Sequence, residues 1–193
     1  MHGKGEEMKH GKTHRDQVAK SLPDWEQKFM AYKALKKKVK LINPHSSRGN
    51  FSDGVNNEGN LPTEDMGFTL LLDRELDKIN TFYIDKEEDY VIKFRELEIR
   101  AENLTGNEEM LEVLREILAF QSEMVMLHHF SITNFQGLIK IVKKHKKRTG
   151  AYSVYSSYMP WDLQQPFLST DLLFNLIMGC EAILDRLSPP NYP

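Results

Sequence analysis

Apolar residues recur every three to four positions along most of the chain, the spacing of a helix that buries one face. The pattern predicts two long helices at 63–103 and 108–148, separated by the turn residues Thr105, Gly106 and Asn107. At 1.5 Å per residue each helix spans roughly 60 Å, so the two should pair in antiparallel fashion. No segment shows the alternation of apolar and polar residues that a strand shows. We therefore expect an all-α fold.

Shorter helices are expected on either side of the long pair. One covers about 9–20 and the next 23–42, where Pro23 suits the first turn of a helix. These two should pair as a small N-terminal hairpin. Gly150 should end the second long helix in a left-handed conformation.

The C-terminal part predicts one more short helix and a tail. Ser169, Thr170 and Asp171 read as a cap for a helix that ends near residue 187. The sequence SPPNYP at 188–193 cannot continue it. Residues 1–7 are expected to form a flexible N-terminal tail. Asn, Gly and Ser dominate 43–63, so we expect a mobile loop there.

Composition and charge narrow the class of protein. The chain has 193 residues, 40% of them apolar and 28% charged, as in an ordinary soluble globular protein. Its net charge of −2 is unevenly spread, with acids gathered in 85–104 and bases in 33–40 and 140–148. Such segregation of charge favours a local anion-binding site over a surface that binds nucleic acid non-specifically.

The remaining compositional signals concern the compartment. Cys180 is the single cysteine, so no intrachain disulfide can form and a reducing intracellular compartment is expected. There is no apolar run of 18 residues and no apolar signal region at the N-terminus. A soluble protein, not secreted by a signal peptide, is the expectation.

Four lysines in 140–148 share one helix face, and we call them the lysine stripe. They stand at i, i+3, i+4 and i+7, within an arc of about 100°, while Leu138, Ile141 and Val142 lie on the other side. Glutamates at i−4, which normally reduce the repulsion between such lysines, are missing here. The repulsion is therefore unrelieved unless an anion binds to this face. The alternative is a solvated helix face. The members of the stripe are Lys140, Lys143, Lys144 and Lys147.

A second set of residues strengthens the case for a site. Tyr32 and Lys36 stand at i and i+4, so their side chains lie next to each other on a helix. Lys36 borders an apolar stripe, which places it near a helix–helix seam where Lys144 could approach it. The alternative for Tyr32 is a core aromatic with its hydroxyl at the surface. Lys9, from a basic N-terminal segment, could contribute as well; alternatively, that segment is a disordered tail.

The residue types indicate what kind of anion would bind. Lysine ammonium groups act as point charges that suit phosphate and lack the planar fork that reads base edges. Aromatic residues do not interleave with the lysines to form a stacking platform. A compact ligand with many phosphates therefore fits better than a nucleic acid, although direct nucleic-acid binding stays open as a weaker hypothesis.

Catalytic and metal-binding motifs are missing from the sequence. His128 and His129 are neighbours, so on a helix they point about 100° apart and do not bind one metal together. Cys180 stands among apolar residues and reads as a small buried hydrophobe. No Walker loop, G-x-S-x-G or H-E-x-x-H sequence occurs. We expect a protein that is not an enzyme and needs no cofactor or metal.

Four segments resemble the SPX domain of eukaryotic phosphate homeostasis, a fifth follows them, and the resemblance covers about 8–187. The stretch at 134–149 is the family's most diagnostic one, and the last segment follows as it does in plant members. The segments are MKHGK at 8–12, LPDW at 22–25 followed by YKALKK at 32–37, ELDKIN at 75–80, NFQGLIKIVKKHKKRT at 134–149 and QPFLSTD at 165–171.

The resemblance implies a single SPX domain at 8–187, an N-terminal helical hairpin on a long-helix bundle that senses inositol polyphosphates and pyrophosphates. By motif position Tyr32, Lys36 and Lys144 are similar to the family's phosphate-binding cluster. The other three members of the lysine stripe are similar to its adjoining surface cluster, and Lys9 could also touch the ligand. Three positions depart from the family pattern, namely His10 in place of Phe, Lys146 in place of Asp, and 151–161, which lacks the usual leucine-proline-phenylalanine pattern.

With nothing following the domain, the chain resembles a stand-alone plant SPX protein. The resemblance implies a ligand-dependent partner, a MYB-type phosphate-starvation-response transcription factor that the loaded domain sequesters in the nucleus or cytoplasm. A second hypothesis keeps the helices as a scaffold that binds a partner without any ligand.

Overall fold

The computed structural model describes residues 15–16, 18–43, 63–150 and 164–188, and every regular element within these residues is a helix. Several predicted features lie outside the described residues. They are the N-terminal tail at 1–7, Lys9, most of the loop at 43–63, the departing segment at 151–161 and all but the first residue of the tail at 188–193. The elements are η1 (Pro23–Lys28), α2 (Tyr32–Leu41), α3 (Thr63–Glu102), α4 (Asn107–Thr149), η4 (Pro166–Leu168) and α5 (Asp171–Leu187).

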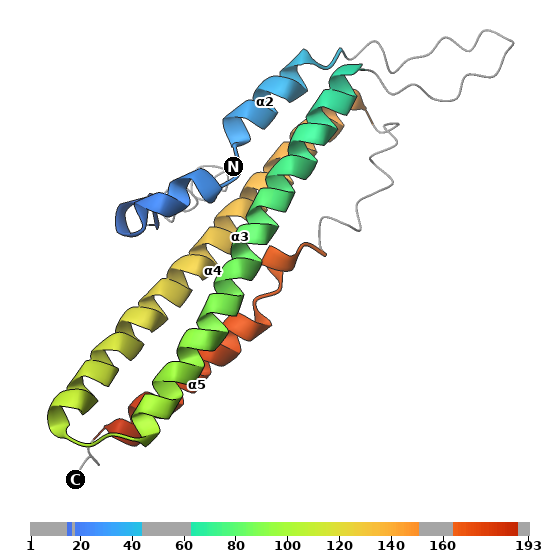
Figure 1. The fold of residues 1–193 in the computed structure, drawn as a ribbon. Helices are drawn as coiled ribbons and strands as arrows, with labels where there is room; N and C mark the ends of the chain where they lie inside the picture. Colours follow the sequence, from blue (N-terminus) through green and yellow to red (C-terminus); the bar gives the residue numbers. More distant parts are fainter. Residues whose placement is uncertain (1–14, 17, 44–62, 151–163, 189–193) are drawn as a thin grey trace, which may run out of the picture.

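The two long helices, α3 and α4, run antiparallel along the whole molecule (Figure 1), as the hydrophobic pattern predicted. Side-chain contacts fix this direction, because Asp65 near the start of α3 meets His145 near the end of α4. At the opposite end, Arg100 of α3 donates to Glu116 of α4 at 2.8 Å. The all-α prediction and both long helices are therefore confirmed.

Gly150 ends α4 with a positive φ of 83°, a region that favours glycine. Its ψ of 173° is extended. The prediction that Gly150 ends the helix with a positive φ is confirmed, but the predicted left-handed helical conformation is wrong. The Gly150 N–H still donates to the carbonyl of Lys146 at 3.1 Å, which satisfies one carbonyl of the last helical turn.

The predicted continuous helix at 23–42 is wrong, because the chain breaks it at Phe29–Ala31 between the 3₁₀ helix η1 and α2. Long-range side chains bind the backbone at this break. The Met30 N–H donates to Asn134 Oδ1 at 2.8 Å, and the Ala31 N–H donates to Glu75 Oε2 at 2.7 Å. Because side chains of α3 and α4 accept from these two N–H groups, both are satisfied without helical hydrogen bonds, and the helix can be interrupted here.

An aromatic cluster joins the N-terminal segment to the long helices. Trp25 of η1 meets Phe82 of α3 edge to face, with ring centroids 5.1 Å apart. Phe29 meets Phe130 of α4 at 4.8 Å, and Phe82 meets the same Phe130 at 5.0 Å. Buried rings in these arrangements stabilise beyond the area that they bury. Of the predicted hairpin's first helix, 15–16 and 18–21 are described as helical, and Val18 is fully buried.

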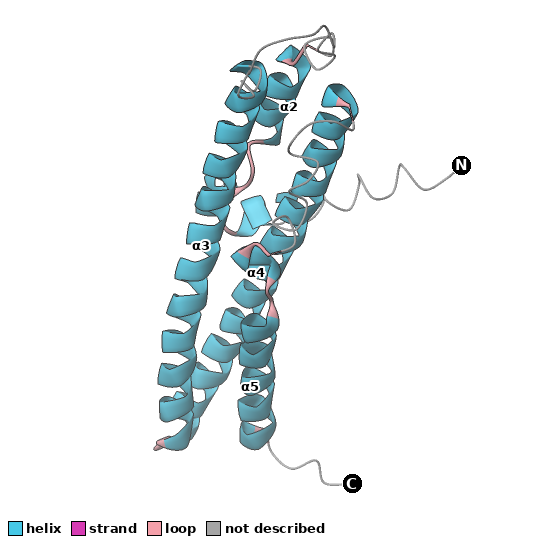
Figure 2. Ribbon diagram, turned by 90° about the vertical axis from the view of Figure 1, so that its right-hand side faces the viewer, coloured by secondary structure: helices cyan, strands magenta, loops and turns pink. Residues whose placement is uncertain are grey.

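The C-terminal helix α5 packs against the half of the α3–α4 pair away from α2 (Figures 1 and 2). Gly179 of α5 allows a close approach there, since a Cβ would lie 2.6 Å from the Phe94 ring of α3. Ser131 of α4 donates to the carbonyl of Phe167 in η4 at 2.5 Å. Thr170 stands at the predicted N-cap position of α5, but its side chain makes no capping hydrogen bond.

Candidate functional site

A groove of about 560 Å³ lies between α2 and the last turns of α4, and we call it the basic groove. It brings together three residues that the sequence predicted as ligand-binding, Lys36 from α2 and Lys144 and Lys147 from α4. Five of its six lining side chains are cationic. The lining residues are Lys36, Val39, Lys40, Lys144, Lys147 and Arg148.

The other predicted site residues that the structure describes lie next to this groove without lining it. Tyr32 is half-buried on α2, one helical turn before Lys36. Lys140 is half-buried and Lys143 is exposed on α4. The lysine stripe is therefore split, with two of its members in the groove and two beside it.

The position of Lys36 follows from how α2 is fixed along α4. The two helices run parallel, because Met30 before α2 meets Asn134, and Ile42 after α2 meets Arg148. The midpoint of α2 must then lie beside α4 between those two contacts. Leu35 and Val39 of α2 are buried, which turns Lys36 to the outer edge of the seam.

The burial pattern of α4 confirms the predicted orientation for three of the four lysines of the stripe, and Lys140 is half-buried. Leu138 and Ile141 are fully buried and Val142 packs against the core. Lys143, Lys144 and Lys147 are exposed on the other side.

The charges of the groove are not neutralised by acids within the described residues. Ion pairs there join Lys78 to Glu75, Lys86 to Glu123, Arg95 to Glu98, Arg100 to Glu112 and Glu116, and His145 to Asp65. None of these pairs includes a cation that lines the groove. The lining cations therefore repel one another, and an anion in the groove would remove that repulsion.

Tyr32 stands one helical turn before Lys36 on α2 and carries a neutral donor. A phenol is protonated at neutral pH, and burial raises the pKa of the Tyr32 phenol further above its ordinary value. A protonated phenol can donate a hydrogen bond to a phosphate oxygen without bringing a negative charge of its own.

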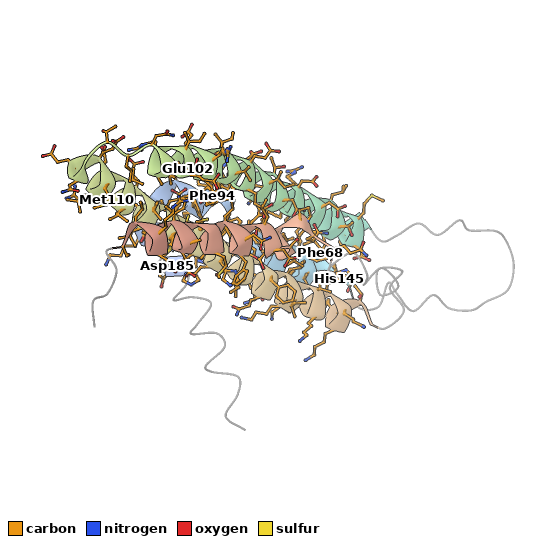
Figure 3. All side chains as sticks on the ribbon, turned by 90° about the horizontal axis from the view of Figure 1, so that it is seen from below. Phe68, Phe94, Glu102, Met110, His145 and Asp185 are labelled. Carbon is orange, nitrogen blue, oxygen red and sulfur yellow. The ribbon has the colours of Figure 1, made fainter. Side chains whose placement is uncertain are left out.

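Sequence reasoning missed a buried contact beneath the lysine stripe. His145 is buried within the cationic run, and its Nε2 meets Asp65 Oδ1 of α3. Its ring stacks on Phe68 with centroids 4.4 Å apart and an interplanar angle of 10°, at the end of the bundle where both are labelled in Figure 3. The signal was present, because His145 follows Ile141 by four positions and Leu138 by seven on the buried face. This contact anchors the end of α4 while its lysines point outward.

Two further cations of the groove, Lys40 and Arg148, were not among the predicted site residues. Arg148 Nε donates to the carbonyl of Ile42 at 2.8 Å, and its Nη2 donates to the carbonyl of Lys40 at 3.2 Å. The sequence placed Arg148 in the cationic run but contains nothing that pairs it with α2, which lies more than a hundred residues earlier.

Features of other kinds of site are sparse in the described part of the chain. It holds no group of three or more His, Cys, Asp or Glu side chains placed to bind a metal ion. Nor does any helix within it have the length and apolarity to span a membrane. Cys180 is buried, and this burial raises the pKa of its thiol to about 11, so it stays protonated and poorly nucleophilic.

No model of a known protein family matches the chain. Curated relatives match nearly all of it. The chain is 40% identical over 194 residues to SPX domain-containing protein 2 of Arabidopsis thaliana, covering 95% of the chain and 67% of that relative. It is 42% identical over 198 residues to SPX domain-containing protein 1 of Oryza sativa subsp. japonica, with the same coverage of both. SPX domain-containing protein 1 of Arabidopsis thaliana is 39% identical over 193 residues, which cover 95% of the chain and 73% of that relative.

A solved structure shares the fold. The SPX domain of Chaetomium thermophilum glycerophosphodiester phosphodiesterase 1, in complex with inositol hexakisphosphate, superposes with a TM-score of 0.69. The match covers 86% of this chain and 93% of that one at 23% identity. At this identity the likeness establishes the helical architecture, and the ligand belongs to that protein.

Proposed function

The chain belongs to the SPX-domain family, and we propose that it binds inositol polyphosphates or pyrophosphates in the basic groove. The observation that carries the proposal is that Lys36 of α2 and Lys144 of α4 line one groove without an acid partner among the described residues. The Chaetomium SPX domain, which has the same fold, was solved with inositol hexakisphosphate, and this supports the ligand class.

The proposed contacts follow from the chemistry of each side chain. Lys36 and Lys144 donate to phosphates that sit in the groove, and Tyr32 adds a neutral donor. Lys147 joins them from the groove wall, while Lys140 and Lys143 attract the ligand from the adjoining surface. Each charge-assisted hydrogen bond contributes about 1.5–3 kcal/mol before the costs of desolvation and ordering. Lys9 is proposed as a further contact.

The proposed role is that of a non-enzymatic sensor in phosphate-starvation signalling. A ligand that bridges α2 and α4 replaces an exposed cationic surface with a neutralised one and ties the two helices together. The loaded form would then bind and inhibit a MYB-type phosphate-starvation-response transcription factor, in the nucleus or the cytoplasm. Only the loaded form has this surface, so partner binding should depend on the ligand.

Titration calorimetry with inositol hexakisphosphate tests the binding step. We expect the triple variant Lys36→Ala/Lys140→Ala/Lys144→Ala to bind at least about 100-fold more weakly than the unaltered protein, since three charge-assisted contacts are lost. A matched triple variant removes the same charge at Lys20, Lys37 and Lys146, which are exposed and do not line the groove, and it should bind more tightly than the groove variant. Equal affinities of the unaltered protein and the groove variant would contradict the proposal.

A ligand-independent scaffold is the second candidate function, and exposed apolar side chains favour it. Leu118 of α4 is 56% exposed and Phe174 of α5 is 62% exposed, on helices that pack against each other. Apolar groups of this kind can dock a partner. Partner capture with and without inositol hexakisphosphate separates the two functions, because a complex of equal amount in both conditions supports the scaffold and contradicts the sensor.

A further inference from the structure

We propose that Arg148 is a positioning residue, which sets the width of the basic groove by holding the end of α2 against the last turn of α4. The inference rests on the proposed function, because the groove is taken to be the binding site. It concerns a residue that the predicted site left out.

Arg148 is the side chain that joins the two walls of the groove at their ends. Its Nε–H donates to the carbonyl of Ile42 at 2.8 Å and its Nη2 donates to the carbonyl of Lys40 at 3.2 Å. The last carbonyls of a helix have no partner within the helix. Arg148 therefore satisfies carbonyl groups at the end of α2 that would otherwise rely on water.

The length of α2 makes this contact important. A helix of ten residues is marginal by itself in water, so contacts with its neighbours must hold it in place. Two side chains hold its start, where Met30 N–H donates to Asn134 and Ala31 N–H donates to Glu75. Arg148 provides the corresponding attachment at its end. Val39 and Ile42 are buried near this end, so without Arg148 the end of α2 would be held by apolar packing alone, which is less directional than a pair of hydrogen bonds.

The lysines that face each other across the groove depend on this placement. Lys36 and Lys40 stand on α2, whereas Lys144 and Lys147 stand on α4. A compact polyphosphate gains from all four only when the helices keep their spacing, because a shift of about 1 Å weakens a directed contact strongly. The repulsion between the two walls acts to push them apart.

Arg148 also lines the groove, so its charge alone could attract the ligand. The two roles differ in what a lysine can replace. Lysine keeps the positive charge, but its single ammonium group lacks the planar fork that reaches two carbonyls at once. A positioning role predicts that Arg148→Lys is harmful, whereas a purely electrostatic role predicts that it is tolerated.

Calorimetry with inositol hexakisphosphate and amide hydrogen exchange of the unliganded protein together test the inference. We expect Arg148→Lys to bind about tenfold more weakly and Arg148→Met somewhat more weakly still. The matched control Lys146→Met removes an exposed charge two residues away and should stay within about twofold. Exchange of the Leu41 and Ile42 amides should be faster in Arg148→Lys than in the unaltered protein, because the end of α2 has lost its attachment.

The outcomes separate this inference from the proposed function. Unaltered exchange at the end of α2 in Arg148→Lys overturns the positioning role, and so does an affinity equal to that of the unaltered protein. If the unaltered protein itself does not bind inositol hexakisphosphate, the proposed function is lost. The exchange rates then still decide whether Arg148 fixes α2. A circular dichroism spectrum equal to that of the unaltered protein confirms that each variant is folded.

Discussion

The surface cations on the two halves of the α3–α4 pair differ in whether they have acid partners. In the half that carries α5, Arg100 contacts Glu112 and Glu116, and Lys86 meets Glu123 at 3.4 Å. In the half that carries α2, the cations that line the basic groove have no acid partner among the described residues. The first half offers acid partners to these cations, whereas the groove leaves its cations to one another. Unpaired charge of one sign on two facing helices therefore marks a site more clearly than the number of lysines does.

The halves also differ in how the helices are held. In the α5 half, the Phe94 ring of α3 lies so close to Gly179 of α5 that a Cβ there would be 2.6 Å away. In the α2 half, Asn134, Glu75 and Arg148 bind the backbone on either side of α2. Close apolar packing joins α5 to α3, whereas α2 combines buried apolar side chains, Leu35 and Val39, with polar attachments at both of its ends.

The largest expected effect is on the free energy of unfolding, from a core substitution in the α5 half that leaves the basic groove unchanged. Phe120 is fully buried in the α5 half and meets Tyr90 with centroids 5.4 Å apart. Phe120→Ala should lower the free energy of unfolding by about 3–5 kcal/mol, through lost burial and the cavity left behind. Urea denaturation measures the loss.

The control for this variant is an exposed phenylalanine in the same half. Phe174→Ala should change the free energy of unfolding by less than about 0.5 kcal/mol. The Phe120→Ala protein that remains folded should bind inositol hexakisphosphate with unaltered affinity. A large loss of affinity would mean that the two halves are not independent.

A smaller effect is expected from the contact beneath the lysine stripe. Asp65→Ala leaves the buried Nε2 of His145 without its carboxylate partner, which should lower the free energy of unfolding by about 1–3 kcal/mol. Asp65→Asn keeps an oxygen acceptor at that place and should recover part of the loss. Thermal unfolding followed by circular dichroism compares the two variants. If both are as stable as the unaltered protein, the contact between Asp65 and His145 does not stabilise the fold.

The smallest effects on the free energy of unfolding should differ in sign between a paired cation of the α5 half and an unpaired cation of the groove. Arg100→Met loses its contacts with Glu112 and Glu116 on the surface, so the free energy of unfolding should fall by up to about 1 kcal/mol. Lys144→Met removes a repelling charge, so without ligand the protein should be unchanged or a few tenths of a kcal/mol more stable. Urea denaturation without ligand measures both. If Lys144→Met is the more destabilised of the two, Lys144 has a structural partner in the folded protein and the comparison is wrong.

Local periodicity predicted the parts of the fold that depend on neighbouring residues. The spacing of Leu138 and Ile141 against Lys144 and Lys147 was enough to orient the end of α4. The break at Phe29–Ala31 was not predictable in this way, because its partners Glu75 and Asn134 stand 44 and 104 residues further along the chain.

In the candidate site, too, the features that depend on local sequence were predictable and those that depend on distant residues were not. Lys36, Lys144 and Lys147 could be chosen from residue type and helical spacing, and the structure places them around one groove. Arg148 could not be chosen for its attachment, since its two acceptors are backbone carbonyls that exist at that position only after α2 has docked. Residue type identifies charge in a sequence, but it does not identify a contact with the main chain of another helix.

The most direct test of the central claim is the affinity of inositol hexakisphosphate for Lys36→Met, for Lys144→Met and for the double variant, measured by calorimetry. If one anion bridges α2 and α4, each single variant should bind about tenfold more weakly or worse while keeping its helical content. The double variant should fall further, and its loss should differ from the product of the single losses, because both side chains contact the same ligand. Single variants that bind as tightly as the unaltered protein would contradict the claim that unpaired cations of the two helices form one anion site.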